Sequence, residues 1–380
     1  MAIKYGKDLV IISLKSSESF AQKVDIILQE WKNSNKPYGA KPCKSFLQTG
    51  TCVRFGTGEG KGILTDTIRG KDVYILVDVC NHSIKYSLFG KENYMSPDDH
   101  YQDLKRVIGA CNGKAKRITV IMPFLYEGRQ HKRNGRESMD CATMLQELAN
   151  MGVEDIITFD AHDARVQNAI PLCSFDNVMP SLQFIETLCK TIPNINLKED
   201  NKNNTIFISP DEGAIHRSVY FANLLGVDMG MFYKRRDYTK IINGKNPIIA
   251  HEYLGPDLKG KDTIVIDDMI SSGDSMIDTC REIKQRGARR VFVFSTFGLF
   301  TNGMDKFDKA YEEKLFDKIF TTNLIYTQPE TLKREYYQPV EMEYYVAAII
   351  DKLNKNKSIA PIITPDTRIK ELLKNYDFKK

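Results

Sequence analysis

The sequence predicts an α/β protein with two domains, each a mostly parallel sheet flanked by helices. Three observations lead to this prediction. The chain has 380 residues, about two and a half times the roughly 150 residues of an ordinary domain. Short apolar runs alternate with segments of helical period, which is typical of strand–helix–strand units. Acidic residues follow a strand in each half, at Asp160 and Asp267, so the halves are expected to be two similar domains.

The clearest strands are apolar runs rich in β-branched residues. We expect them at residues 9–13, 73–79, 118–122, 156–159, 205–209, 263–266 and 290–296. Helical patterns follow at 138–150, 214–225 and 275–286, and each ends close to a glycine, Gly152, Gly226 or Gly287, as helices commonly do. The polar stretches 32–45, 81–101 and 194–204 are expected to be loops or insertions.

Composition excludes several classes of protein. Hydrophobic residues make up 42% of the chain and charged residues 27%, the balance of a folded globular protein. The 54 Lys and Arg exceed the 49 Asp and Glu by only five, so nothing predicts a nucleic-acid partner. No apolar run approaches the ~18 residues needed to cross a membrane. The eight scattered cysteines contain no CxxC pair, and we expect a reduced, cytoplasmic protein.

The most informative stretch is TIVIDDMISSGDS at residues 263–275. A buried strand is followed by Asp267 and Asp268, at the edge where ligands bind in open α/β sheets. Adjacent carboxylates accept hydrogen bonds from a diol or face Mg²⁺, and a loop of small residues at a helix N-terminus binds anions. A sugar phosphate fits both features, although an acidic helix cap that serves stability alone is the simpler alternative. The loop residues are Ser271, Ser272, Gly273, Asp274 and Ser275.

This stretch resembles the 5-phosphoribosyl-binding motif of the type I phosphoribosyltransferase fold. Four further stretches occur in the order and spacing found in ribose-phosphate pyrophosphokinases: FLYEGRQHKR (124–133), ITFDAHDARVQNAIP (157–171), ISPDEGAIHRS (208–218) and YKRRD (233–237). The resemblance covers roughly residues 8–350. It implies two phosphoribosyltransferase-like domains and a Mg²⁺-dependent transfer of diphosphate from ATP to ribose 5-phosphate. The products would be 5-phosphoribosyl 1-diphosphate, used in nucleotide biosynthesis, and AMP.

The resemblance also assigns residues to the ATP side. Arg129 and Gln130 match the family's Arg-Gln pair that holds ATP, with the guanidinium offering charge and a planar donor fork; a solvated loop cation is the alternative for Arg129. Phe55 and Glu59 match an aromatic residue and an acid that reach the adenine across a subunit boundary. Thr57 stands where the family has an aspartate.

Three residues are implied to act near the metal. His162 matches a position next to the triphosphate and its metal, and Asp160 lies beside it in the sequence. Asp211 matches an acid that binds Mg²⁺ or the ribose, and carboxylate oxygens suit that hard cation. The alternatives are a structural histidine and an Asp that caps the following helix.

The catalytic cations implied by the resemblance are Lys234 and Arg236, which match the family's mobile loop. In-line transfer demands little covalent chemistry of the protein, because charge spreads over the phosphoryl oxygens and cations placed there lower the barrier. A solvated charged surface is the alternative.

The chain departs from the family pattern near the phosphate loop and the Arg-Gln pair. Ser271 replaces a third acid, and Asp274 with Ser275 replaces a Gly-Thr pair. Because Asp274 adds negative charge beside a bound phosphate, weaker ribose 5-phosphate binding is a hypothesis that follows. His131 replaces an acid after Arg-Gln.

We expect domains at residues 1–178, completed by 336–380 with a helix near 341–353, and at 179–335, with the active site between them. The family implies homo-oligomers, either a dimer or a hexamer built from dimers. Two alternatives remain at this point. One is a non-catalytic regulatory relative that associates with an active synthase, favoured by Thr57, Ser271 and Asp274. The other is a phosphoribosyltransferase, which would leave the ATP-side residues without a role.

Overall fold

The computed structural model describes residues 8–36, 41–195, 197, 204–236 and 248–376. It divides into two compact units. The first comprises Met1–Met179, Asn323–Tyr326 and Glu341–Thr364, and the second Pro180–Thr322, Thr327–Val340 and Pro365–Lys380. In the described part of the chain, no helix is long and apolar enough to span a membrane.

Each unit contains a seven-stranded sheet, and the two sheets have the same strand order. The first runs β3-β2-β1-β4-β7-β8-β9 and the second β12-β11-β10-β13-β14-β15-β16. Neighbours are parallel except at one edge, where β2 pairs antiparallel with β3 and β11 with β12. The predicted α/β class, with two mostly parallel sheets flanked by helices, is confirmed.

The strands of the first sheet are β1 (Leu9–Ser13), β2 (Leu47–Arg54), β3 (Gly60–Leu64), β4 (Asp72–Leu76), β7 (Arg117–Ile121), β8 (Asp155–Phe159) and β9 (Ser174–Val178). Those of the second are β10 (Thr205–Ser209), β11 (Asp228–Arg236), β12 (Ile248–Leu254), β13 (Asp262–Ile270), β14 (Arg290–Gly298), β15 (Lys318–Thr322) and β16 (Tyr337–Val340). The central strands β1, β4 and β10 are buried along their whole length, which explains why their sequences are continuous apolar runs.

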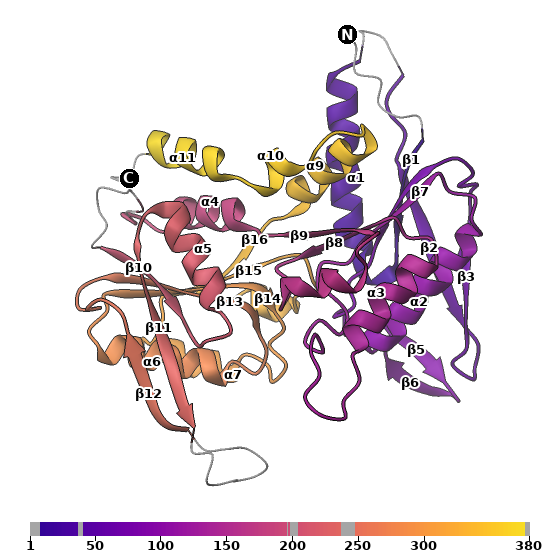
Figure 1. The fold of residues 1–380 in the computed structure, drawn as a ribbon. Helices are drawn as coiled ribbons and strands as arrows, with labels where there is room; N and C mark the ends of the chain where they lie inside the picture. Colours follow the sequence, from indigo (N-terminus) through magenta and orange to yellow (C-terminus); the bar gives the residue numbers. More distant parts are fainter. Residues whose placement is uncertain (1–7, 37–40, 196, 198–203, 237–247, 377–380) are drawn as a thin grey trace. The chain divides into compact units, whose positions relative to one another are not determined.

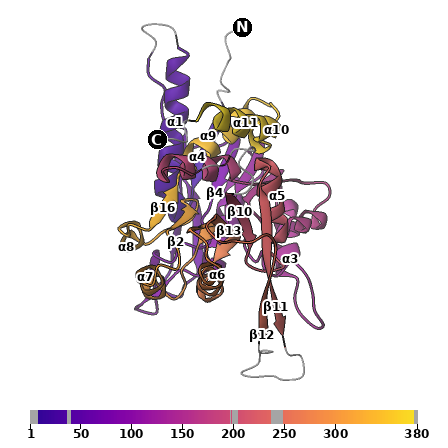
Figure 2. The ribbon, with the colours of Figure 1, turned by 90° about the vertical axis from the view of Figure 1, so that its left-hand side faces the viewer.

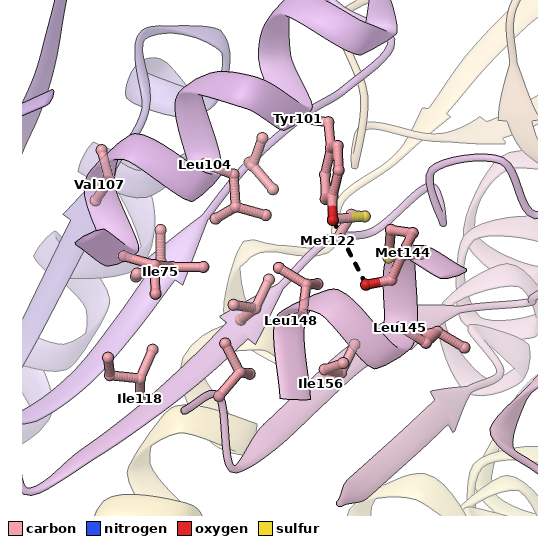
Figure 3. Packing of buried hydrophobic residues seen from close by; sticks show 14 of the residues in the cluster. Ile75, Tyr101, Leu104, Val107, Ile118, Met122, Met144, Leu145, Leu148 and Ile156 are labelled. Carbon is pink, nitrogen blue, oxygen red and sulfur yellow. Dashed lines mark hydrogen bonds between the residues drawn. The ribbon is translucent and has the colours of Figure 1, made fainter. Parts of the chain in front are cut away.

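In the first unit, α1 (Glu18–Ser34) packs on β1 and β2 and against α9 (Glu343–Asn354), and α10 (Ala360–Ile363) packs on α9. The helix α2 (Pro97–Cys111) packs along β2 and β3. It begins at a capping box in which the Ser96 and Asp99 side chains each bind the other's backbone N–H, so its start is fixed by local sequence. Beneath α2 and α3 (Asp140–Asn150), apolar residues including Ile75, Leu104, Val107, Leu145 and Leu148 form one buried cluster (Figure 3).

In the second unit, α4 (Ser181–Thr191) and α5 (Ile215–Leu225) lie on one face of the sheet, and α6 (Asp274–Gln285) and α7 (Asp305–Glu312) on the other (Figures 1 and 2). The short helix α8 (Pro329–Leu332) precedes β16, and α11 (Asp366–Asn375) packs against α4. That packing groups the segment from Pro365 onward with the second unit, whereas we had expected it to complete the first.

Several expected features differ in detail. The helix expected at 138 begins at Asp140, because the Ser138 hydroxyl donates to the Asp140 carboxylate rather than capping a backbone N–H. Within the polar stretch 194–204, Ile195 and Leu197 are buried. The stretch 81–101 includes a β-hairpin, β5 (Lys85–Leu88) and β6 (Lys91–Tyr94), and the start of α2.

The acids Asp160 and Asp267 do not occupy corresponding places in the two sheets. Asp160 follows β8, the sixth strand in the order, whereas Asp267 lies on β13, the fourth. The first-unit counterpart of β13 is β4, and the acid that follows β4 is Asp78. The two sheets therefore correspond, but the acid that corresponds to Asp267 is Asp78 and not Asp160.

Candidate functional site

The paired acids of the second unit, Asp267 and Asp268, lie where one side of their strand loses its neighbouring strand; we call this arrangement the acidic step. Pairing of β13 with β10 ends at Val265, whereas pairing with β14 continues to Ile270. Asp267 and Asp268 therefore lie within the strand, at the point where its β10 side becomes free. The backbone N–H of Asp268 donates to the Asp267 carboxylate at 2.9 Å. The register thus places both acids at the carboxyl edge of the sheet, as predicted, with the strand continuing two residues further.

A buried arginine, which the sequence argument did not single out, faces these acids. Arg217 on α5 lies 3.6 Å from Asp268 and both side chains are buried. Burial, followed by the charges of Asp268 and Asp211, raises the pKa of the Asp267 carboxyl well above its ordinary value, and Arg217 opposes that shift. Three acids around one cation leave a surplus of negative potential, which favours hydroxyl donors or a cation.

Asp211 lies in the turn between β10 and α5. Its Oδ1 accepts hydrogen bonds from the backbone N–H groups of Gly213 at 2.9 Å and Ala214 at 3.2 Å. One carboxylate oxygen thus organises the start of α5, which is the helix-capping alternative raised for this residue. The same side chain is close enough to Asp267 to affect its pKa, so capping and ligand binding are compatible.

The loop between β13 and α6, which the sequence predicts to bind an anion, depends on a glycine. Gly273 is the residue before α6 and has φ +83°. A β-carbon there would lie 2.1 Å from the Phe307 ring of α7. Only glycine fits both the left-handed backbone and the close ring, so the ring sets the position at which residues 271–273 enter α6.

The extra charge of Asp274 is matched by a lysine. Lys306 at the start of α7 lies 2.5 Å from Asp274 Oδ1, and the Ser272 hydroxyl donates to Oδ2 at 3.0 Å. The Lys306 hydrogen bond and then the Ser272 hydrogen bond lower the pKa of Asp274. The negative charge of Asp274 is therefore balanced by Lys306. This lysine also places a cation beside the loop, which the sequence motif did not reveal.

Lys234 and Arg236 lie on β11. Their backbones pair with His251 and Ile248 of β12, with an irregularity between Arg235 and Arg236. Pairing of β10 with β11 ends at Met231, so this part of β11 is held by β12 alone, and the two strands extend away from the rest of their sheet (Figures 1 and 2). The resemblance implies a loop at this place, whereas the described backbone is a two-stranded ribbon through Arg236.

In the first unit, the segments after β7 and β8 lie together. The rings of His131 and His162 have centroids 5.4 Å apart, and His131 Nε2 lies 3.6 Å from Asp163 Oδ2. Asp163 is also paired with Arg165, and their hydrogen bond holds the pKa of Asp163 well below its usual range. The fold thus brings an acid to His131, which replaces an acid in the family pattern; Asp163 was missed because it lies 32 positions further along the chain.

The other ATP-side candidates differ in exposure. Arg129 and Gln130 are exposed in a turn in which the Gln130 N–H donates to the Glu127 carbonyl at 2.8 Å. His162 is exposed, whereas Asp160 is buried with φ +41°, and its N–H donates to the Val178 carbonyl. Arg129, Gln130 and His162 are therefore accessible to a ligand, while Asp160 sits inside the turn that presents His162.

Phe55 and Glu59 lie in the tight turn between β2 and β3. The Phe55 N–H donates to the Glu59 carbonyl at 2.8 Å, and the Phe55 side chain is 54% exposed. Thr57 donates its hydroxyl to the Glu59 carboxylate at 2.9 Å. Thr57, which departs from the family pattern, therefore orients Glu59, which matches that pattern.

No single cluster of metal ligands is assembled in the described residues, where no group of three or more His, Cys, Asp or Glu has the geometry to hold an ion. His162 and Asp160 belong to the first unit and Asp211 to the second. Mg²⁺ needs only one or two carboxylates when substrate phosphates complete its coordination. The acidic step of the second unit has the donor chemistry for such a site.

Asp78, the counterpart of the acidic step in the first unit, has a structural role with a pH dependence. It is buried and accepts hydrogen bonds from the backbone N–H groups of Cys80 at 2.8 Å and Tyr326 at 2.6 Å. Burial raises its pKa to about 7 against the opposing effect of those bonds. The unfolded chain therefore releases this proton near pH 4 while the folded chain keeps it until about pH 7.

We predict that Asp78→Asn changes the pH dependence of stability. The wild type should lose roughly 3–4 kcal/mol of unfolding free energy through this group between pH 4 and 8, because the folded state binds the extra proton. The variant should lack that loss. Its unfolding free energy should instead be lowered by an amount that does not change with pH, because the Asn side chain has one acceptor oxygen in place of two. Urea unfolding of both proteins at several pH values measures the difference, and parallel profiles would contradict the assignment.

Comparison with known proteins follows the two units. Residues 9–152 match the family model described as the N-terminal domain of ribose phosphate pyrophosphokinase, and residues 177–331 match the phosphoribosyl transferase domain. A ribose-phosphate pyrophosphokinase of Pasteurella multocida is 26% identical over 84% of this chain and 92% of its own. That of Mycoplasma genitalium is 27% identical over 84% of each chain.

A solved structure shares the fold over nearly the whole chain. The phosphoribosylpyrophosphate synthetase from Mycobacterium smegmatis superposes with a TM-score of 0.71 at 20% identity, covering 92% of this chain and 100% of that one. The two matched domains and the two relatives named above show that the chain belongs to the ribose-phosphate pyrophosphokinase family.

Proposed function

We propose that this protein is an ATP-dependent ribose-phosphate diphosphokinase. It transfers the β,γ-diphosphoryl group of ATP to the 1-hydroxyl of ribose 5-phosphate and releases AMP. The observation that carries the proposal is the acidic step of β13 directly followed by the loop that precedes α6, in a chain whose first unit matches the N-terminal domain of ribose phosphate pyrophosphokinase.

Ribose 5-phosphate is assigned to the second unit. The carboxylates of Asp267 and Asp268 accept hydrogen bonds from the ribose hydroxyls, and Arg217 lies 3.6 Å from Asp268 on the side of α5. The 5-phosphate binds at the N-terminus of α6, where backbone N–H groups and the helix dipole favour an anion. The residues proposed for this phosphate are Ser271, Ser272, Gly273, Asp274 and Ser275.

ATP is assigned to residues of the first unit. Arg129 and Gln130 bind phosphate or base through their exposed donors, His162 lies beside the triphosphate, and Phe55 with Glu59 binds the adenine. Lys234 and Arg236 of the β11–β12 ribbon neutralise charge that develops as the 1-hydroxyl attacks the β-phosphorus and AMP leaves. Mg²⁺, held by Asp211 with His162 and Asp160 as further candidates, would neutralise phosphate charge when bound. Phe55 and Glu59 are proposed to act across a subunit boundary, so the working form is a homo-oligomer.

The test is formation of AMP from ATP and Mg²⁺ by the purified protein, with and without ribose 5-phosphate. AMP that appears only with the sugar, matched one for one by the diphosphorylated ribose, is the expected result. A folded protein that binds ATP but forms no AMP would instead favour the regulatory relative, and pyrophosphate release with a base and no ATP would favour a phosphoribosyltransferase.

We predict that the Asp274–Lys306 pair tunes the affinity for ribose 5-phosphate. Lys306→Met leaves the Asp274 charge unpaired beside the phosphate loop, so the KM for ribose 5-phosphate should rise by up to about fivefold, the scale of an exposed ion pair. Adding Asp274→Asn to the same protein should restore the affinity. Initial rates at varied ribose 5-phosphate measure both, and an unchanged KM in the single variant would show that the pair lies outside the field of the phosphate.

A further inference from the structure

The tip of the β5–β6 hairpin holds a phenylalanine in an unfavourable place. The two-residue turn is Phe89–Gly90, with φ +48° and +74°. Positive φ at both positions is the geometry of a type I′ turn, which strongly favours Asn-Gly. A bulky aromatic residue in the left-handed region is an outlier, and the Phe89 side chain is 77% exposed. Neither backbone preference nor burial explains a phenylalanine here, and such strain concentrates at functional sites.

The hairpin tip is attached to the turn that carries Phe55 and Glu59. The Phe89 N–H donates to the Gly56 carbonyl at 2.8 Å. Leu88 lies where a side chain on Gly58 would be, with its Cδ1 2.7 Å from an ideal β-carbon position. Two tight turns, each with an exposed phenyl ring, are therefore held together at one edge of the first unit.

The base of the hairpin is anchored as well. The guanidinium of Arg54, the last residue of β2, lies over the Tyr86 ring at 5.1 Å, and the Tyr86 hydroxyl donates to Asp99 of α2 at 3.4 Å. Arg54 itself is paired with Asp103 of the same helix. The hairpin is thus fixed to β2 and α2 at one end and to the Phe55 turn at the other, which gives its tip a defined position.

We propose that Phe89 binds the purine base of the nucleotide substrate together with Phe55 and Glu59. Exposed aromatic rings provide stacking surface for a base, and the Glu59 carboxylate, oriented by Thr57, accepts a hydrogen bond from an exocyclic amine. This inference rests on the proposed function, because that function supplies ATP as the ligand of the Phe55 turn. It assigns Phe89, within a segment that the sequence indicated only as a loop or insertion, to recognition of the base.

The test uses Phe89→Asn, which removes the ring and supplies the residue that a type I′ turn prefers. The unfolding temperature should stay the same or rise. The KM for ATP should rise about five- to 150-fold, the scale of losing one stacked aromatic, with kcat and the KM for ribose 5-phosphate unchanged. Tyr94→Ala is the matched control, since Tyr94 is 58% exposed but lies at the far end of β6, where the Lys85 ammonium lies over its ring.

Calorimetric binding separates base recognition from other effects. ATP affinity should fall in Phe89→Asn, whereas affinity for inorganic triphosphate, which has no base, should match the wild type. Equal ATP affinity in the two proteins would overturn the proposal, and so would a parallel loss of triphosphate affinity. A changed oligomeric state with unchanged ATP affinity would also overturn it and assign the ring to contact with a second copy. If the wild type forms no AMP, the proposed function fails, yet the same titrations still decide the role of Phe89.

Discussion

Replacing Lys234 by alanine is expected to lower kcat about 10³-fold, by analogy with the loss of a cation that stabilises phosphoryl transfer. The reason is that charge spreads over the phosphoryl oxygens during transfer, and a positioned cation stabilises the transition state more than the bound substrates. The backbone pairing of Lys234 with His251 does not depend on the side chain, so the unfolding temperature should not change. Initial rates of AMP formation at saturating substrates measure the effect.

Two further variants make this result specific. Lys234→Arg keeps the charge and should retain more activity than Lys234→Ala. Arg235→Ala removes the adjacent cation, which has no proposed role, and should stay within about fivefold of the wild type, because a cation with no transition-state role contributes no more than an ordinary ion pair. Near wild-type turnover in Lys234→Ala would remove Lys234 from the catalytic machinery and leave Arg236 to be tested in the same way.

Gly273→Ala is expected to destabilise the second unit and abolish ribose 5-phosphate binding. The left-handed conformation at φ +83° disfavours a β-carbon by roughly 1–2 kcal/mol, and displacing the Phe307 ring adds roughly 1–3 kcal/mol. Because Gly273 immediately precedes α6, relief of the overlap moves the N–H groups that we propose to bind the phosphate. Urea unfolding and titration with ribose 5-phosphate measure the two effects.

Gly303→Ala separates the two causes. Gly303 has φ +74°, but among the described residues other than its two chain neighbours no atom lies within 4 Å of an added β-carbon. This control should therefore show only the backbone effect, about 1–2 kcal/mol, with ribose 5-phosphate affinity retained. Equal destabilisation in both variants would mean that the Phe307 ring moves without resistance, and the ring would then not define the phosphate loop.

The central strands of both sheets were predictable because they are buried on both faces. Strands 9–13 and 205–209 were located to the residue, since a strand covered on both faces reads as an unbroken apolar run. The edge hairpins were not among the clearest predictions: β2 and β3 alternate between exposed and half-buried residues, and β5–β6 consists mostly of polar and aromatic residues. Half-exposed strands lack the run that identifies a buried one.

The sequence by itself determined the fold class, the family resemblance and the candidate residues that lie in short contiguous motifs, such as Asp267 with the loop that follows it. Only the tertiary structure decided which distant residues join those motifs. Arg217 reaches Asp268, Lys306 neutralises Asp274, Asp163 meets His131 and Phe89 is tied to Gly56. The physical reason is that strand order and helix packing bring these partners together from separate segments, and no local pattern encodes a contact between residues that lie far apart in the sequence.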